Sequence, residues 1–450
     1  MTPSLRVYFL LVLGALAGIG IATIGIDLFS PRFLPIALWL MLGYDAIVLF
    51  LVVLDGWQLR RYRVVVEREV QPRLSIGREN LVKLMVKTGA RPAIVHILDN
   101  APASFSVHPE QHQRSLPAHH SEILSYTVFP NRRGSYTWGN LYVRQLGQWG
   151  LAWQTWQIPA KQTVAVYPDL IGLRELSIKL TLQTSGNLKR LRQLGIGTEF
   201  AELRDYALGD DPRLIDWKAT ARHDSTGNGE STRLLVRVLE PEQEQTLIIL
   251  LDRGRLMTAQ VQGLSRFDWG LNAGLALALT GLSRGDRVGF GVFDRQMHCW
   301  VPPERGQTHL TKLIERLTPL QPELLEPDYM GAVTAAAMHQ TRRALVVLIT
   351  EVIDATASVE LLSAMGRLAP RHLPCCVTLR DPQVDRQAEI ETCDIDLAYT
   401  RAVALDLLEQ RQLALGQLQQ RGVLVLDAPA NQVSQPLVDR YLLLKARNRL

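Results

Sequence analysis

The chain has 450 residues, of which 47% are hydrophobic, and this length suggests about three domains of ordinary size. The formal net charge of +5 is mild, and the basic residues are scattered instead of gathered on one stretch, which argues against a nucleic-acid-binding protein. The four cysteines show no metal-ligand spacing and agree with a reducing compartment: Cys299, Cys375, Cys376 and Cys393.

Two apolar runs open the chain, at residues 7–26 and 33–54. Each is close to the ~20 residues that a bilayer-spanning helix needs, and no signal-peptide cleavage site precedes the second run. We therefore expect a two-helix transmembrane hairpin over residues 1–60. Basic residues flank the hairpin on both sides, so the positive-inside rule predicts a two-pass protein of the plasma (inner) membrane with both termini and the soluble domains in the cytoplasm.

Asp45 lies in the middle of the second apolar run. An ionisable residue inside a membrane span marks a candidate functional site. The alternative is a protonated acid that forms a hydrogen bond to the neighbouring helix or to a second copy of the protein. Neither run contains another ionisable group that would complete a proton relay.

Residues 61–168 change to a period-two pattern with Gly, Pro, Asn and Asp between the apolar segments, which is typical of a β-sandwich domain. The expected strands are 63–70, 80–86, 93–98, 123–129, 134–139 and 141–143. Four histidines fall in the predicted loop before the fourth strand: His108, His112, His119 and His120. Their spacing fits no structural zinc site, so a solvated loop is the alternative to a metal site.

Residues 169–232 are predicted to form a linker, with a weak helical pattern over 170–194, and then a charged segment at 197–222. This signature segment interleaves six carboxylates and four basic residues with aromatic and aliphatic side chains. Buried charges need partners, so we interpret it as an ion-paired junction beside a recognition surface. Asp211 followed by Pro212 predicts the start of a short helix that continues to residue 221. The candidate interaction residues are Arg204, Tyr206, Gly209, Asp210, Asp211, Arg213, Asp216, Trp217, Lys218 and Arg222.

Residues 233–450 alternate continuous apolar strands with helices, which predicts an α/β domain with a mainly parallel sheet covered on both faces. The expected strands are 234–239, 246–251, 287–293, 344–350, 374–379 and 423–426. Ligands of such sheets bind at the carboxyl ends of the strands. Asp252, Thr350 and Glu351 lie at such ends, and Asp328 can join them from a loop.

Few enzyme motifs are present. The sequence has no P-loop, no HExxH and no dinucleotide-binding glycine motif. Residues 281–285 match GxSxG, but a helix is expected before them and a strand after them, the reverse of a nucleophile elbow. The carboxylates of the signature segment could form a catalytic pair, or they could pair with the basic residues around them.

The signature segment carries a family resemblance. Gly197-x-Glu199-Phe200, Leu203-Arg204-x-Tyr206 and the run from Gly209 to Arg222 resemble the hallmark of the bacterial family called domain of unknown function 58. The resemblance implies a carboxy-terminal domain similar to a von Willebrand factor type A domain. It also implies a MoxR-type AAA+ ATPase as partner in maturing or assembling other complexes. No catalytic activity is established for the family.

A von Willebrand factor type A domain implies a Mg²⁺ site formed by a DxSxS motif, a threonine and an aspartate. Here Asp252 is retained, but Gly254 and Leu256 replace the two serines and Glu351 replaces the second acid. A hard cation needs several oxygen ligands, so Asp252, Asp328 and Glu351 would form a degenerate site at most. We expect no cofactor, and recognition of partners through the loops of this domain.

These patterns together predict a membrane-anchored cytoplasmic adaptor without enzymatic activity that binds protein partners, a MoxR-type ATPase among them, and no nucleic acid. Two alternatives stay open. One is a metal-dependent hydrolase that uses Asp210, Asp211 or Asp216, and the other is a non-catalytic structural envelope protein.

Overall fold

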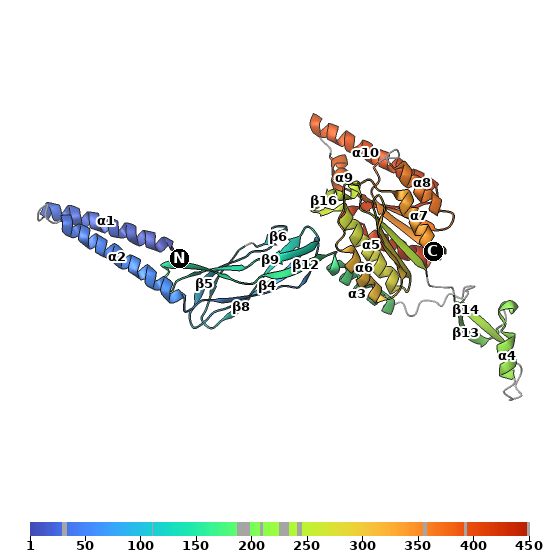
Figure 1. The fold of residues 1–450 in the computed structure, drawn as a ribbon, viewed down its shortest axis with the longest axis horizontal. Helices are drawn as coiled ribbons and strands as arrows, with labels where there is room; N and C mark the ends of the chain where they lie inside the picture. The colour runs from blue at the N-terminus through green and yellow to red at the C-terminus, as the bar shows by residue number, and fades with distance from the viewer. Residues whose placement is uncertain are drawn as a thin grey trace. The chain divides into compact units, whose positions relative to one another are not determined.

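The computed structural model describes residues 1–28, 34–109, 111–186, 199–207, 210–224, 234–240, 245–353, 358–390 and 394–447. These fall into two compact units, Met1–Asp169 and Leu170–Leu450. Figure 1 follows the chain from two N-terminal helices through a β-rich region into an α/β region. The chain is therefore a multi-domain protein, as its changes in hydrophobic period predict.

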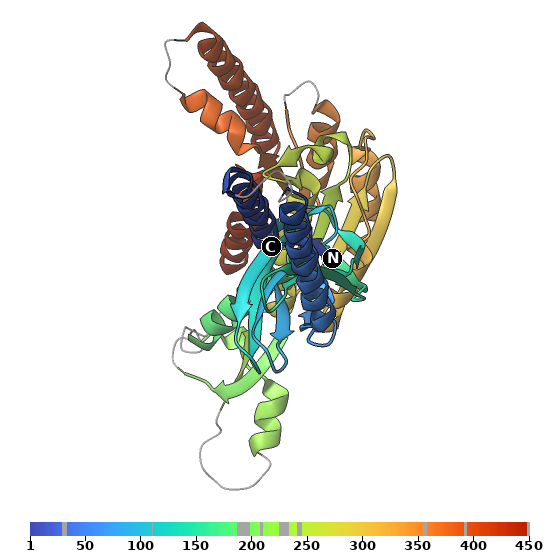
Figure 2. The same cartoon turned by 90° about the vertical axis from the view of Figure 1, so that its left-hand side faces the viewer.

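Two helices begin the first unit, α1 (Leu5–Leu28) and α2 (Leu34–Leu59), and they pack against each other (Figures 1 and 2). In α2, Leu38–Leu59 is long and apolar enough to cross a membrane, whereas α1 contributes a shorter apolar helix, Leu5–Ile21. The described residues thus hold one candidate span where the sequence predicts two. Length and apolar composition therefore support one span and not the two of the predicted hairpin.

The end of α2 is fixed to the β-rich region through Asp55. Its carboxylate is buried and accepts three backbone N–H bonds, from Trp149 at 3.2 Å and from Leu151 and Ala152 at 3.1 Å each. On the α1 side, the Ser4 hydroxyl donates to a carbonyl of the same turn at 2.6 Å. A buried carboxylate needs such donors, so this turn holds the helix pair against the sheet.

Asp55→Asn is expected to lower the free energy of unfolding of the first unit by about 1–3 kcal/mol, because one acceptor oxygen becomes a donor that faces backbone N–H groups. Hydrogen exchange on the full-length protein in detergent checks this, as faster exchange at Trp149, Leu151 and Ala152. Asp45→Asn is the matched control: it makes the same change in the same helix without touching these bonds. Unchanged exchange in the Asp55 variant would contradict the prediction.

The β-rich region folds into three sheets, with strand orders β1-β11-β10-β5-β7, β2-β4-β8-β6 and β3-β12-β9. The strands are β1 (Thr2–Pro3), β2 (Val65–Glu69), β3 (Arg73–Ser75), β4 (Asn80–Lys87), β5 (Ala93–Asp99), β6 (Phe105–His108), β7 (Gln111–Leu116), β8 (Ser121–Pro130), β9 (Gly134–Trp138), β10 (Leu141–Leu146), β11 (Ala152–Ile158) and β12 (Gln162–Tyr167). Alternate residues are buried, as in β4 with Val82, Leu84 and Val86. This alternation confirms the period-two prediction.

The predicted histidine loop is wrong. His108 ends β6 and His112 is buried in β7, so two of the four histidines belong to strands. Burial lowers the pKa of His112 below its ordinary value and so favours the neutral ring. Across the described residues, no three His, Cys, Asp or Glu side chains group as a metal site would require. β7 was not predicted because most of its residues are polar, whereas a strand is recognised in a sequence by its alternating apolar residues.

The α/β region is built on a six-stranded mixed sheet with strand order β19-β18-β15-β20-β21-β22. Its strands are β15 (Thr246–Asp252), β18 (Arg287–Phe293), β19 (Met297–Glu304), β20 (Leu345–Thr350), β21 (Leu373–Arg380) and β22 (Leu424–Pro429). All pair in parallel except β19, which runs antiparallel to β18 at the edge. β19 was not predicted from the sequence because Pro302 and Pro303 interrupt its pattern; proline is tolerated at a sheet edge.

Helices cover both faces of this sheet (Figure 1). They are α3 (Leu170–Gly186), α5 (Arg266–Ser283), α6 (Gln307–Leu317), α7 (Tyr329–His339), α8 (Val359–Leu368), α9 (Pro382–Glu389), α10 (Ile395–Gln420) and α11 (Ser434–Ala446). Short elements complete the region: η3 (Arg255–Thr258), β16 (Gln260–Val261), β17 (Leu264–Ser265) and η4 (Ala430–Gln432). The GxSxG match lies between the end of α5 and the start of β18, which confirms that it is a helix-to-strand turn.

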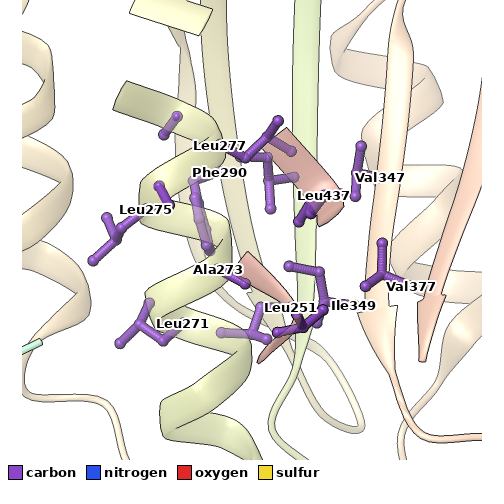
Figure 3. Packing of buried hydrophobic residues seen from close by; sticks show 14 of the residues in the cluster. Leu251, Leu271, Ala273, Leu275, Leu277, Phe290, Val347, Ile349, Val377 and Leu437 are labelled. Atoms are coloured by element: carbon purple, nitrogen blue, oxygen red, sulfur yellow. The ribbon is translucent and has the colours of Figure 1, made fainter. Parts of the chain in front are cut away.

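Alternate side chains of the strands supply two separate cores. Ile249 and Leu251 of β15 pack with α5 and α11, whereas Ile248 and Leu250 pack with α7, α8 and α10. Figure 3 shows the first core, with Leu251 and Ile349 of the sheet on the side of α5 that carries Ala273. A strand buried on both faces has no polar side, which explains its continuous apolar sequence.

Candidate functional site

The described residues of the signature segment form one strand followed by two helical turns, and the strand pairs with a second strand that follows the segment in the chain. β13 (Glu199–Asp205) pairs antiparallel with β14 (Leu235–Glu240), and η2 (Pro212–Leu214) and α4 (Trp217–Asp224) lie between them. The sequence analysis assigns residues 234–239 to the strands of the α/β domain, and this is wrong because the partner of β14 is β13. The pairing places residues 199–205 beside residues 235–240.

The helix predicted from Asp211 is interrupted. Asp211 does accept a bond from the Arg213 N–H at 3.0 Å, with Pro212 following it, but this cap starts only the short turn η2. Ile215 then bridges to Val236 of β14, which holds the chain extended. Asp216 caps the second start, accepting from the N–H groups of Lys218 and Ala219. Pairing with a distant strand thus divides one predicted helix into two.

Two ion pairs fix the segment. Arg204 of β13 lies 2.5 Å from Asp210, which also accepts from the Ala207 N–H at 2.8 Å. Arg237 of β14 lies 2.8 Å from Asp216. The hydrogen bond from Arg204 lowers the pKa of Asp210, and the bond from Arg237 lowers the pKa of Asp216 to about 2. Both acids are therefore ionised at neutral pH, and neither is poised as a proton donor.

The remaining signature residues face outward. The Trp217 side chain is 65% exposed at the first turn of α4. Arg213 and Lys218 on either side are exposed and form no ion pair with any described carboxylate, and Arg222 is also exposed. Tyr206 donates its hydroxyl to the Asp210 carbonyl at 3.4 Å. Gly209 lies outside the described residues. The segment thus exposes a tryptophan with basic side chains on either side of it.

A second constellation lies at the carboxyl end of the parallel strands, around Asp252. Its carboxylate accepts from the Thr350 hydroxyl at 2.7 Å, the Tyr329 hydroxyl at 3.2 Å and the Gly254 N–H at 2.7 Å. Burial is the largest effect on this group and raises the pKa of Asp252 to about 6. Three donors of the protein thus satisfy the hydrogen-bonding capacity of the Asp252 carboxylate, and one of them, the Tyr329 hydroxyl, lies directly beside it.

The other predicted metal ligands point to different partners. Asp328 is exposed and caps α7 by accepting from the Gly331 N–H at 2.7 Å. Glu351 is buried and pairs with Arg411 of α10, with Arg266 at 3.7 Å. In the part of the chain that the structure describes, Asp252, Asp328 and Glu351 do not form a cluster suited to a metal ion. The geometry provides little support for a three-acid cation site.

Glu351 belongs to a buried ion-pair cluster whose other members, Arg411 and Asp427, were not predicted from the sequence. Arg411 reaches Glu351 at the end of β20 and Asp427 of β22, the latter at 2.9 Å. Thr378 of β21 donates to the same Asp427 at 2.8 Å. In the sequence, a charged residue at a buried position of a helix is the only sign that an ion pair is present. The sequence does not indicate which acidic residues Arg411 contacts.

Comparisons with known proteins agree with the sequence resemblance over part of the chain. The family described as "Protein of unknown function DUF58" matches residues 202–394. Uncharacterized proteins of Mycobacterium bovis and Mycobacterium tuberculosis are 24% identical over 191 residues, which is 42% of this chain. The chain spans 57% of the length of these relatives.

Solved structures are similar only distantly. The conserved hypothetical protein BatB from Bacteroides thetaiotaomicron has a TM-score of 0.32 and 15% identity, covering 45% of this chain and 99% of that one. The CARDB domain of a Pyrococcus furiosus protein has a TM-score of 0.17 and 14% identity, covering 23% of this chain and 93% of that one. At these TM-scores the likeness is too weak to establish a shared fold.

Proposed function

We propose that this protein is a membrane-anchored cytoplasmic adaptor that binds a MoxR-type AAA+ ATPase in the assembly or maturation of other complexes. The observation that carries the proposal is which side chains of the signature segment are ion-paired and which are exposed. The carboxylates of Asp210 and Asp216 are held in ion pairs, while Trp217 and its neighbouring basic residues remain exposed. Tryptophan and arginine are the residues that most often dominate binding energy at protein interfaces.

The α/β region is proposed to be a von Willebrand factor type A-like domain that recognises partners without a metal. Asp252 at the end of β15 matches the first acid of such a domain, and Thr350 lies beside it. Tyr329 supplies a hydroxyl in place of the missing serines. The pattern therefore favours a binding module over the hydrolase alternative.

The anchor is proposed to be the helix pair, with both helices in the membrane and both termini in the cytoplasm. Leu38–Leu59 supports one span by length and composition, and α1 packs along it. Arginines flank the helix pair at the end where it meets the β-rich region.

Trp217→Ala is expected to weaken partner binding roughly 30-fold or more, because truncation of an interface hot spot costs at least about 2 kcal/mol. The measurement is a pull-down of the tagged full-length protein from native membranes, followed by identification of the bound ATPase and titration with it. Met338→Ala, an exposed apolar residue (76%) on α7, is the matched control and should bind as wild type.

Two outcomes would count against this proposal. If the intact protein recovers no AAA+ ATPase, the partner assignment fails. If Trp217→Ala binds the ATPase as tightly as wild type, the partner is recognised elsewhere on the molecule and the role given to the signature segment is wrong.

A further inference from the structure

Arginine and aromatic side chains gather where α1 and α2 meet the β-rich region. We refer to the arginines as the arginine collar: Arg6, Arg60, Arg61, Arg63, Arg91 and Arg144. Four of them lie over aromatic rings: Arg91 at 4.2 Å from the Tyr62 centroid, Arg61 at 4.9 Å from Trp57, Arg144 at 4.9 Å from Trp153 and Arg63 at 5.4 Å from Trp156. Aromatic and basic residues of this kind concentrate at membrane–water interfaces.

The collar arginines differ from several other arginines of the same unit, which do pair with carboxylates. Arg68, Arg78 and Arg114 each pair with a carboxylate. No collar arginine pairs with an Asp or Glu among the residues described. Asp55 lies at the same junction, but its oxygens are buried and accept backbone N–H bonds. Six cations against one buried carboxylate leave this rim with a net positive charge.

A depression of about 420 Å³ lies within the collar, between the start of α1 and the sheet. Arg6 and Arg144 line it together with Tyr8, Leu146 and Trp153. The depression combines two guanidinium groups, which suit phosphate, with apolar and aromatic walls. Leu5, the first residue of α1, also lines the depression, and its side chain is 88% exposed.

We propose that the arginine collar binds the headgroup phosphate of an anionic phospholipid, with Arg6 and Arg144 contacting the phosphate in the depression and Leu5 and Tyr8 lying against the acyl chains. The proposal rests on the proposed membrane anchoring of the helix pair. It places the lipid in the leaflet next to the β-rich region, where a surface of negative charge attracts such clusters. The lipid would hold the soluble domains at a fixed orientation to the membrane.

The test uses the full-length protein in a neutral detergent and follows its thermal unfolding as lipid is added. Phosphatidylglycerol should raise the unfolding temperature, and phosphatidylcholine should not, because only ligand that binds the native state stabilises it. The Arg6→Gln/Arg144→Gln double variant should lose most of this shift. Arg73→Gln is the matched control, since Arg73 also lies over a ring, that of Tyr167 at 5.4 Å, outside the collar.

Several results would overturn the proposal: an equal shift with phosphatidylcholine, an equal shift with glycerol phosphate in solution, or a full shift in the double variant. Native mass spectrometry of the retained lipid gives an independent readout if the double variant melts too early. Carbonate extraction of membranes separates this proposal from the anchoring itself. Release of the wild-type protein by carbonate would refute anchoring, whereas retention with no anionic preference would refute the lipid site alone.

Discussion

Arg411→Met is expected to lower the free energy of unfolding of the α/β region by about 3–5 kcal/mol, because it leaves Glu351 and Asp427 without their shared cation in a buried site. Burial raises the pKa of Glu351, and the positive charge of Arg411 opposes this. Methionine has a similar length and keeps the apolar packing, so the loss would reflect the charge. Pulse proteolysis of the full-length protein in urea measures it.

Two further variants separate the charge effect from packing. Arg421→Met, an exposed residue just after the same helix, should change stability little. Arg411→Met combined with Glu351→Leu should cost less than the sum of the two single changes, because the pair is removed together. Additive losses would show that Arg411 and Glu351 are not coupled and would contradict the role assigned to this pair.

Asp252→Asn is expected to stabilise the protein at pH 8 by roughly 3 kcal/mol. Burial raises the pKa of Asp252 from 3.8 to about 6, so the folded protein holds this proton more tightly than the unfolded chain does. The stability that this group contributes is present below about pH 4, and it is lost as the pH rises through about 6. Asparagine removes that loss, since its oxygen can accept from Gly254 and its amide can donate to the Thr350 or Tyr329 hydroxyl.

Unfolding curves of wild type and variant from pH 4 to pH 8 check this result, with the difference expected to vanish near pH 4. Asp328→Asn is the matched control, because asparagine caps a helix as well as aspartate does and Asp328 is exposed. If Mg²⁺ bound at Asp252, the variant would instead be less stable than wild type in the presence of Mg²⁺. That outcome would reverse the interpretation of this site.

Much of the local secondary structure could be predicted from the sequence alone. The alternation in residues 80–87 determines a strand with one buried face, and the continuous apolar run at 246–251 determines a strand buried on both. The surroundings of the GxSxG match were also predictable, because a helical period before it and a strand period after it describe a turn and not a nucleophile elbow. These features depend on neighbours within a few residues.

Which charged side chains pair with one another could not be predicted from the sequence. Asp252 and Thr350 are 98 positions apart, and Arg411 and Glu351 are 60 apart, yet each pair is in contact because β15, β20 and the face of α10 converge at one edge of the sheet. In the signature segment, the partner of Asp216 proved to be Arg237, on a strand that the sequence assigns to another sheet. Hydrophobic period reveals which face of an element is buried, but it carries no information about which distant element covers that face. Which ions pair across the strands can therefore be established only from the folded structure.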